Sequence, residues 1–213
     1  MIMVGIAGRK GSGKDTLASG MLTWWLKSYG LLRDGNVYHM ADVLKKTSVD
    51  LFGISRTSVY GSQQQKDQLT QYGWGDMPTY DIMTEPRPPR NKKMTCREFL
   101  QYFGTEICRT MNHSIHIDAT MRKIHSDESE SSALDYLVVV ADLRFPNECD
   151  AIRKAGGKII LVTRGDNEKT DEHSSENSLD NYEFDAIIDN ASMNKHQQLN
   201  AAITYLREAF QLS

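Results

Sequence analysis

The stretch from Gly8 to Lys14 has the residue types and the spacing of a loop that binds phosphate. It reads Gly-Arg-Lys-Gly-Ser-Gly-Lys, which fits the first seven positions of the P-loop pattern, and it follows an apolar run typical of a buried strand. The glycines let successive backbone amides point at a polyphosphate, and the lysine adds positive charge. The motif predicts phosphate binding, the alternative being a purely structural glycine turn. The residues assigned to this loop are Gly8, Gly11, Ser12, Gly13 and Lys14, followed by Asp15 and Thr16.

The residue after the lysine departs from the pattern. A P-loop normally has Ser or Thr there to bind magnesium, whereas this sequence has Asp15 and places its hydroxyl one position later, at Thr16. We therefore expect a metal ion to be held partly through water, with Thr16 close to the phosphates. Asp15 is interpreted either as a carboxylate favoured by a helix N-terminus or as a residue with a direct role.

Charged residues also follow two later apolar runs. Asp142 comes directly after residues 136–141, and a carboxylate at the end of a buried strand can be the magnesium partner of a P-loop. The alternative for Asp142 is a cap of the helix that begins at Pro146. Arg144 and Arg164 are predicted to stabilise charge on a transferring phosphoryl group, or else to be solvated surface residues.

These residues need a scaffold of alternating strands and helices. Apolar runs predict strands at 2–7, 37–40, 136–141, 158–163 and 184–189, and amphipathic patterns predict helices at 14–28, 42–51, 146–155 and 194–210. We interpret 126–132 as a polar, acidic connection. The order predicts an α/β fold with a doubly wound, mainly parallel five-stranded sheet of the P-loop NTPase type. In the last helix we expect an inward face of Leu199, Ala202, Ile203, Leu206 and Phe210.

Residues 53–94 interrupt this alternation. They hold four of the five prolines, which indicates either a surface excursion or an irregular lobe that grips a substrate. Thr95 has the spacing of a capping box and predicts a helix running to about Met111. Its expected inward face is Cys96, Leu100, Phe103, Ile107 and Met111, and its polar face Arg97, Gln101, Thr105 and Arg109. We therefore predict a single domain, 1–213, with an inserted lobe at 53–111 and a lid loop at 164–182.

Composition excludes several classes of protein. The chain has 213 residues, and its 25 basic and 28 acidic residues give a net charge of −3, so no cationic field is available to hold a nucleic-acid polymer. Three cysteines at spacings that match no metal or redox motif favour a reducing compartment, the cytoplasm. The longest apolar run is too short for a membrane helix, and the N-terminus does not resemble a secretory signal.

Taken together, these residues resemble those of the phage-type deoxynucleoside monophosphate kinases. The resemblance rests on the loop from Ser12 to Thr16 and on residues that follow in the family's order. These are Ala41 and Lys45, Leu100 and Gln101, Gly104 and Thr105, Asp142, Arg144 and Glu148, Arg164, His173 and Glu176, and Ile188 and Asn190.

The resemblance implies transfer of the γ-phosphate of ATP, with Mg²⁺, to a deoxynucleoside 5′-monophosphate in a cytoplasm, that of the host if the gene is viral. A phosphate monoester is already anionic at neutral pH, so it needs no general base. On this reading Asn190 lies near the adenine, and a homodimer is left open. The residues assigned to the acceptor are Asp42, Lys45, Trp74 (or Tyr72), Arg97, Gln101, Arg109, Glu148, His173 and Glu176.

Two alternatives remain open at this point. One is a P-loop kinase of another small molecule, such as dephospho-coenzyme A or a phosphorylated alcohol, for which Asp42 or Asp142 would be the candidate base. The other is a nucleotide-dependent switch module, against which the sequence has no Asn-Lys-x-Asp segment. Ala191 and Ser192 stand where relatives often have an acidic residue and glycine, so base specificity is not predicted.

Overall fold

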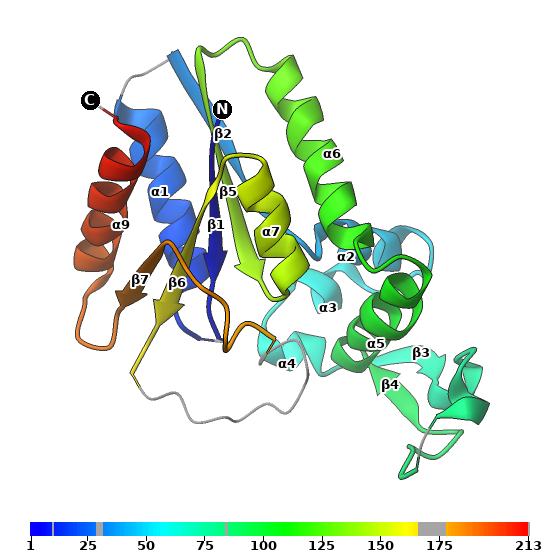
Figure 1. The fold of residues 1–213 in the computed structure, drawn as a ribbon. Coiled ribbons are helices and arrows are strands. Elements are labelled where there is room, and N and C mark those ends of the chain that lie inside the picture. The colour runs from blue at the N-terminus through cyan, green and yellow to red at the C-terminus, as the bar shows by residue number, and fades with distance from the viewer. Residues whose placement is uncertain (10, 29–31, 84, 166–177, 213) are drawn as a thin grey trace. The chain divides into compact units, whose positions relative to one another are not determined.

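The structure is a computed structural model, and it describes residues 1–9, 11–28, 32–83, 85–165 and 178–212. The chain forms two compact units (Figure 1). Unit 1 consists of Met1–Met40 and Ile117–Ser213, and unit 2 of Ala41–His116. Each unit is described by itself.

Unit 1 is built on a parallel sheet of five strands in the order β2-β5-β1-β6-β7. The central strands β1 and β5 are buried on both faces, which explains their continuous apolar runs. The predicted α/β fold with a mainly parallel five-stranded sheet is confirmed. The strands are β1 (Ile2–Ala7), β2 (Arg33–His39), β5 (Asp135–Leu143), β6 (Lys158–Thr163) and β7 (Ala186–Asp189).

Helices cover both faces of this sheet, as a doubly wound fold requires. Helices α1 (Lys14–Ser28) and α9 (Lys195–Phe210) pack on one face, where Trp25 and Leu206 are buried with strand residues. Helices α6 (Ile115–Glu130) and α7 (Pro146–Lys154) pack on the other face, through Ile124 and Ile152 (Figure 1). Both faces of the sheet are therefore covered by helices, and the polar residues of its strands lie mainly in the edge strand β2 and at strand ends.

Unit 1 corrects four predictions. The expected connection at 126–132 is helical as far as Glu130, because α6 buries Ile117 and Ile124 at a helical spacing and exposes its charged end to solvent. Strand β2 begins at Arg33 rather than at residue 37, since an edge strand has one open side and tolerates polar residues. Strand β5 continues to Leu143, and β7 begins only at Ala186.

Unit 2 is a small α+β body with an aromatic core. A two-stranded antiparallel ribbon and short helices fill the stretch predicted as an irregular lobe. Its core contains Ile54, Val59, Met94, Cys96, Phe99 and Tyr102. The elements are α2 (Asp42–Asp50), α3 (Arg56–Tyr60), α4 (Gln63–Lys66), β3 (Leu69–Gly73), β4 (Lys93–Thr95), α5 (Cys96–Tyr102), the 3₁₀ turns Trp74–Asp76 and Tyr80–Ile82, and a π-helix, η4 (Phe103–Arg109).

The capping box predicted at Thr95 is present, but the inward face of the following helix differs from the prediction. Cys96, Phe99 and Tyr102 are buried, whereas Met111 is 78% exposed. The chain widens to a π-helix at Phe103, so a face extrapolated at 3.6 residues per turn loses its register.

The structure bears on two features noted in the sequence, the absence of a membrane helix and the state of the cysteines. Within the described ranges, no helix has the length and apolar character needed to cross a membrane. The three cysteines, Cys96, Cys108 and Cys149, are free in the structure.

Candidate active site

The phosphate loop connects β1 to α1, and its glycines adopt backbone angles that favour glycine. Gly11 has φ +79° and Gly13 has φ +96°. At Gly8 a Cβ atom would lie 2.5 Å from the carbonyl oxygen of Val162, so any side chain would collide with β6. Lys10 lies outside the described residues. The loop therefore has the backbone freedom that the motif predicted.

Lys14 folds back over this loop. The residue is 6% exposed, and its Nζ donates to the carbonyl oxygen of Arg9 at 3.2 Å. The same Nζ lies 3.2 Å from Oδ1 of Asp142. The structure thus brings together the lysine and the aspartate that the sequence separates by more than a hundred residues.

Asp142 stands at a bulge in β5. Ile6 pairs with Ala141 and Ala7 pairs with Leu143, so Asp142 has no partner residue on β1. Its φ of 63° is unusual for a residue other than glycine. Such strain and bulges are concentrated at functional sites, because they redirect a side chain at a small energetic cost. The bulge accounts for a strand that runs past Asp142 instead of ending there.

Arg144 and Glu148 surround this aspartate in different ways. A guanidinium nitrogen of Arg144 lies 3.3 Å from Oδ1 of Asp142. Glu148 is 1% exposed, and its Oε2 accepts hydrogen bonds from the amides of Arg144 at 2.8 Å and Phe145 at 3.2 Å. Glu148 therefore orders the segment that carries Arg144. It also accepts the Phe145 amide at the start of α7, where the alternative interpretation of Asp142 had placed that residue as a cap.

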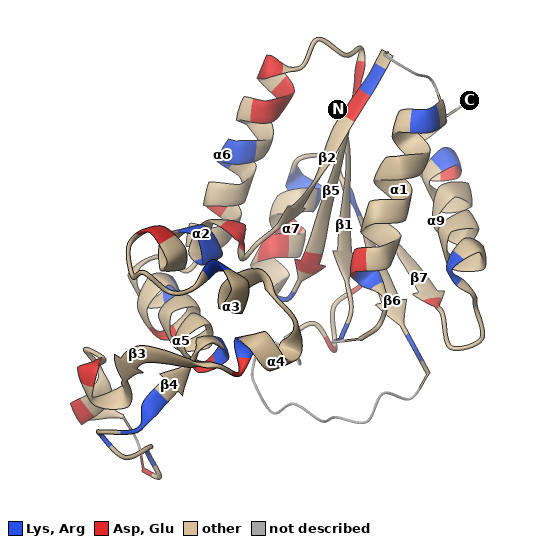
Figure 2. Cartoon of the chain, turned by 180° about the vertical axis from the view of Figure 1, so that it is seen from behind, with Lys and Arg blue, Asp and Glu red and all other residues tan. Residues whose placement is uncertain are grey.

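The unusual Asp15 has a neighbour that the sequence did not suggest. Its side chain is 75% exposed, and its Oδ1 lies 3.7 Å from Nε2 of His39, at the end of β2. Thr16 is exposed in the first turn of α1, and Arg164 is exposed directly after β6. In Figure 2 charged residues colour the start of α1 and the tip of β5. His173, Glu176 and most of the expected lid lie outside the described residues.

The side chain of Asn190 contacts the backbone of the phosphate loop. Asn190 follows β7, and its backbone N–H donates to the carbonyl oxygen of Thr163 at 3.0 Å. Its side-chain Nδ2 donates to the carbonyl oxygen of Ser12. This contact with the loop was not predicted, and the place of Asn190 near the adenine stays a prediction.

In unit 2 the predicted acceptor residues are held by neighbours within the unit. The Nε of Arg97 donates to Asp67 at 3.0 Å, and its guanidinium also bonds Gln63. Arg109 donates to the carbonyl oxygen of His113 at 3.3 Å. Of the others, Lys45 lies 5.7 Å from the ring of Tyr60, Trp74 meets Tyr102 edge to face, Asp42 begins α2, and Gln101 lies in α5.

Unit 2 also contains an apolar cavity of about 410 Å³. Tyr72 lines it, but its hydroxyl already donates to the carbonyl oxygen of Phe52 at 3.0 Å. Four of the nine remaining lining residues are aromatic, and Trp74 does not line the cavity. The lining residues are Phe52, Gln71, Tyr72, Asp76, Met77, Pro78, Phe99, Tyr102, Phe103 and Ile107.

Fold and site together define a class of protein. A parallel sheet whose first strand leads through a glycine loop into a helix, with lysine and aspartate meeting at neighbouring strand ends, is the architecture of the P-loop phosphate-binding proteins.

Comparison with known proteins gives the family. The family model described as deoxynucleotide monophosphate kinase matches residues 34–199. A protein of Acanthamoeba polyphaga mimivirus, named "Putative deoxynucleotide monophosphate kinase", is 30% identical over 190 residues, covering 84% of this chain and 82% of the viral protein. The chain belongs to the deoxynucleotide monophosphate kinase family, and it is a kinase, a phosphotransferase.

The family match and the phosphate loop indicate the chemistry of this protein independently of each other. The match to the family model begins at residue 34, after the loop and all of α1. Two parts of the chain that do not overlap therefore point to the same chemistry, and a switch module without transfer activity does not fit this family.

Proposed function

We propose that this protein transfers the γ-phosphate of ATP to deoxynucleoside 5′-monophosphates, yielding deoxynucleoside diphosphates and ADP, with Mg²⁺. The observation that carries the proposal is the meeting of Lys14 and Asp142 at the phosphate loop, in a chain of this kinase family. A nucleotide acceptor is favoured over dephospho-coenzyme A or a phosphorylated alcohol by the family's description.

The acceptor chemistry fits a site built mainly from cations and amides. The second pKa of a phosphate monoester is near 6, so the attacking oxygen is ionised at neutral pH and needs no base. Catalysis then depends on aligning two anionic groups and neutralising charge on the phosphoryl group in flight. Lys14 and the loop amides would bind the donor phosphates, and Arg144 and Arg164 would stabilise the transition state.

The residues present fit a magnesium ion bound together with nucleotide. Mg²⁺ needs only one or two protein oxygens when phosphates and water complete its shell. Asp142 offers Oδ1, which lies 3.2 Å from Lys14 and 3.3 Å from Arg144, and Thr16 offers an exposed hydroxyl. Bound there, Mg²⁺ would neutralise phosphate charge. Among the described residues, no group of three or more His, Cys, Asp and Glu could hold a metal by itself.

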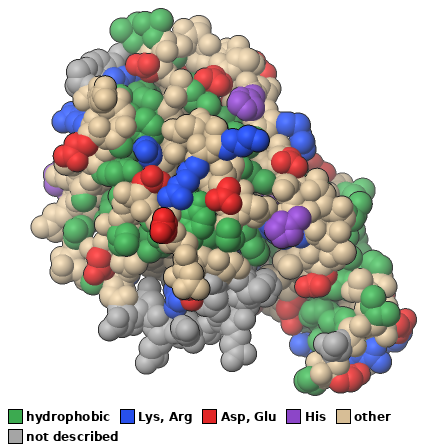
Figure 3. All heavy atoms as spheres, viewed as in Figure 1, with side chains coloured by type: hydrophobic (Ala, Val, Ile, Leu, Met, Phe, Trp, Pro, Cys, Tyr) green, Lys and Arg blue, Asp and Glu red, His purple; other side chains and the backbone are tan. Residues whose placement is uncertain are grey.

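Recognition of the acceptor is proposed for the lobe and the lid. Residues 53–111 would bind the monophosphate through Arg97, Gln101 or Arg109, and residues 164–182 would close over the site. On the face shown in Figure 3, basic and acidic side chains are interspersed rather than separated by sign. That no nucleic-acid polymer is bound and that the protein works in a cytoplasm stay predictions, and the question of a homodimer stays open.

An acceptor panel tests the function. ADP release from ATP and Mg²⁺ would be measured with each of the four common deoxynucleoside monophosphates, with dephospho-coenzyme A and with phosphorylated alcohols. We expect stimulation by at least one deoxynucleotide and none by the other acceptors. Stimulation only by a non-nucleotide acceptor would overturn the proposal.

A further inference from the structure

Two buried amide side chains, those of Asn190 and Gln198, lie against the phosphate loop. Gln198 is 4% exposed and Asn190 is 9% exposed. A Cβ atom on Gly13 would lie 2.8 Å from Nδ2 of Asn190 and 3.4 Å from Nε2 of Gln198. The loop glycine therefore packs directly on both amides, and only glycine fits at this position.

The contact made by Asn190 orients one peptide group of the loop. Its Nδ2 donates to the carbonyl oxygen of Ser12. In a trans peptide the carbonyl and the following N–H point in opposite directions. Because the Ser12 carbonyl faces the buried amide, the N–H of Gly13 is turned away from the interior, which is the direction a phosphate-binding loop requires.

Gln198 lies on the same side of the loop, because its Nε2 would be 3.4 Å and its Oε1 3.6 Å from a Cβ atom on Gly13. If the Ser12–Gly13 peptide flipped, the N–H of Gly13 would turn toward the donating Nδ2 of Asn190 and toward Nε2, the nearer polar atom of Gln198, and donors repel donors. The two amides thus favour the orientation in which a carbonyl points inward. Their own positions are fixed, since the backbone of Asn190 bonds Thr163 and Asn194 caps helix α9, in which Gln198 lies.

Three buried polar atoms around the phosphate loop lower the stability of the fold. Nε2 of Gln198, Oδ1 of Asn190 and Oγ of Ser12 have no hydrogen-bond partner among the described residues. Leaving a buried polar group unpaired destabilises the folded state. Leucine would fill the space of Gln198 without that cost, so the glutamine is better explained by function than by stability.

We propose that Gln198 is a positioning residue of the phosphate loop: together with Asn190 it holds the Ser12–Gly13 peptide so that the Gly13 N–H faces the nucleotide phosphates. This inference deepens the proposed function and rests on it. It also gives Asn190 a role through the loop.

The test replaces Gln198 by residues of similar size. Gln198→Leu removes the donor and Gln198→Glu exchanges it for an acceptor, while Asn200→Leu, at an exposed position of α9, is the matched control. ATP affinity would be titrated directly, hydrogen exchange of the Gly13 amide would be followed by NMR without nucleotide, and Tm would be recorded.

We expect Gln198→Leu to keep or raise the Tm, to accelerate or shift Gly13 exchange, and to weaken ATP binding roughly 10-fold, with the KM for the acceptor unchanged. Gln198→Glu should weaken ATP binding further, and Asn200→Leu should leave ATP binding and Gly13 exchange unchanged. If Gln198→Leu does not fold, Gln198→Met takes its place.

Wild-type ATP affinity and wild-type Gly13 exchange in Gln198→Leu, or in Gln198→Met where that is used, would overturn the positioning role. Failure of the proposed function shows differently. The wild-type protein would then bind no ATP or phosphorylate no deoxynucleotide, whereas the Gly13 exchange of the variants would still report on the loop.

Discussion

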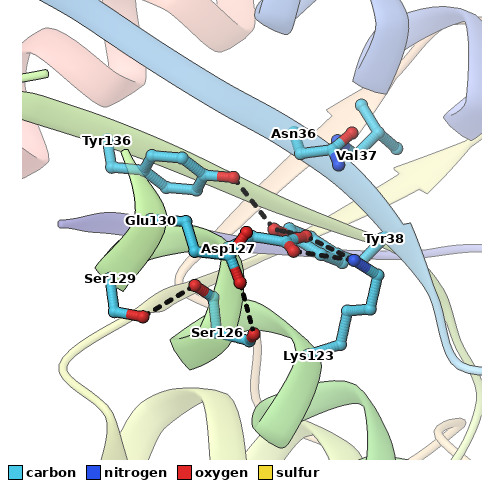
Figure 4. Close-up of polar contacts among 9 residues, drawn as sticks. All are labelled: Asn36, Val37, Tyr38, Lys123, Ser126, Asp127, Ser129, Glu130 and Tyr136. Carbon is cyan, nitrogen blue, oxygen red and sulfur yellow. Dashed lines mark hydrogen bonds and ion pairs between the residues drawn. The ribbon is translucent and has the colours of Figure 1, made fainter. Parts of the chain in front are cut away.

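Unit 1 contains two polar clusters, one buried and one built around two buried tyrosines, that use their hydrogen bonds differently. The loop cluster consists of Ser12, Asn190 and Gln198, and each of these side chains keeps one polar atom unpaired among the described residues. The tyrosine cluster consists of Tyr38, Tyr136, Asp127 and Lys123, which all find partners in one another (Figure 4).

The tyrosine cluster connects α6 to the strands β2 and β5. The hydroxyl of Tyr38 donates to Oδ2 of Asp127 at 2.9 Å and lies 3.0 Å from the hydroxyl of Tyr136. Lys123 donates to both oxygens of Asp127, at 2.7 and 2.9 Å. Burial, with these hydrogen bonds, raises the pKa of Tyr38, so that hydroxyl stays a donor over the ordinary pH range.

The difference separates polar groups that stabilise the fold from polar groups that prepare a site. A fully paired network offsets its desolvation and fixes the packing of a helix. A partly paired one costs stability and is retained where a backbone or a ligand must be held. Substitutions in the tyrosine cluster should therefore reduce stability, and substitutions at the loop should reduce activity.

The largest effect is expected for Lys14→Ala. Removing the cation from the phosphates should lower phosphoryl transfer roughly 1000-fold. The unfolding free energy should change little, because Lys14 contacts only Arg9 and Asp142 among the interactions described. ADP release and urea unfolding measure the two quantities, with the exposed Lys27→Ala at the other end of α1 as control. Normal turnover of Lys14→Ala would contradict the role of the loop.

The second largest effect is expected for Arg144→Ala and Arg164→Ala. If these guanidiniums stabilise charge in the transition state, kcat should fall roughly 10- to 100-fold with little change in KM. Steady-state kinetics at saturating ATP, with the acceptor varied, measure both. An unchanged kcat with a raised KM would assign the arginines to binding of the ground state.

Asp127→Ala should destabilise the fold without affecting transfer. It leaves the Tyr38 hydroxyl and Lys123 without their shared acceptor, so we expect a loss of about 1–2 kcal/mol in unfolding free energy. The control is Asp50→Ala, which breaks the exposed i,i+4 pair with Lys46 in α2 and should cost less than about 0.5 kcal/mol. Equal losses in the two variants would remove the distinction between a buried network and a surface pair.

The smallest effect is a pH dependence of stability. Hydrogen bonds from Lys123, and then from Tyr38, hold the pKa of Asp127 below its ordinary value of 3.8. A lowered pKa contributes stability above pH 3.8 that is lost as the pH falls through the folded-state pKa. The difference in unfolding free energy between the wild type and Asp127→Asn should therefore shrink below that pH. A difference that stays constant down to pH 2 would contradict this assignment.

Sequence reasoning succeeded where the signal is local. The loop is recognisable because its glycines and lysine have fixed spacing, and β1 and β6 have their predicted bounds because strands buried on both faces are continuously apolar. Asp142 was placed at the correct strand end for the same reason. Its bulge was not predicted, because it depends on how β5 aligns with β1.

Sequence reasoning failed where the surroundings of a residue come from distant parts of the chain. Gln198 lies one residue before Leu199, the first residue of the apolar face expected for α9. It is buried because the phosphate loop packs on it. His39 meets Asp15 only after β2 and α1 are assembled. In unit 2, the carbonyl of Gly104 in the π-helix lies 3.1 Å from Nε2 of His116, a contact that no helical period predicts.

The order of the strands also governs how the chain can assemble. Ile2 pairs with Leu137, so the central sheet cannot begin to form until β5 has been synthesised. Unit 2 is one continuous segment between β2 and β5, and its contacts can form first. Once folded, it would shorten the effective loop that must close to bring β2 to β5, which lowers the entropic cost of closure. Early folding of the inserted segment is thus expected to offset part of the delay that its length would otherwise impose on the sheet.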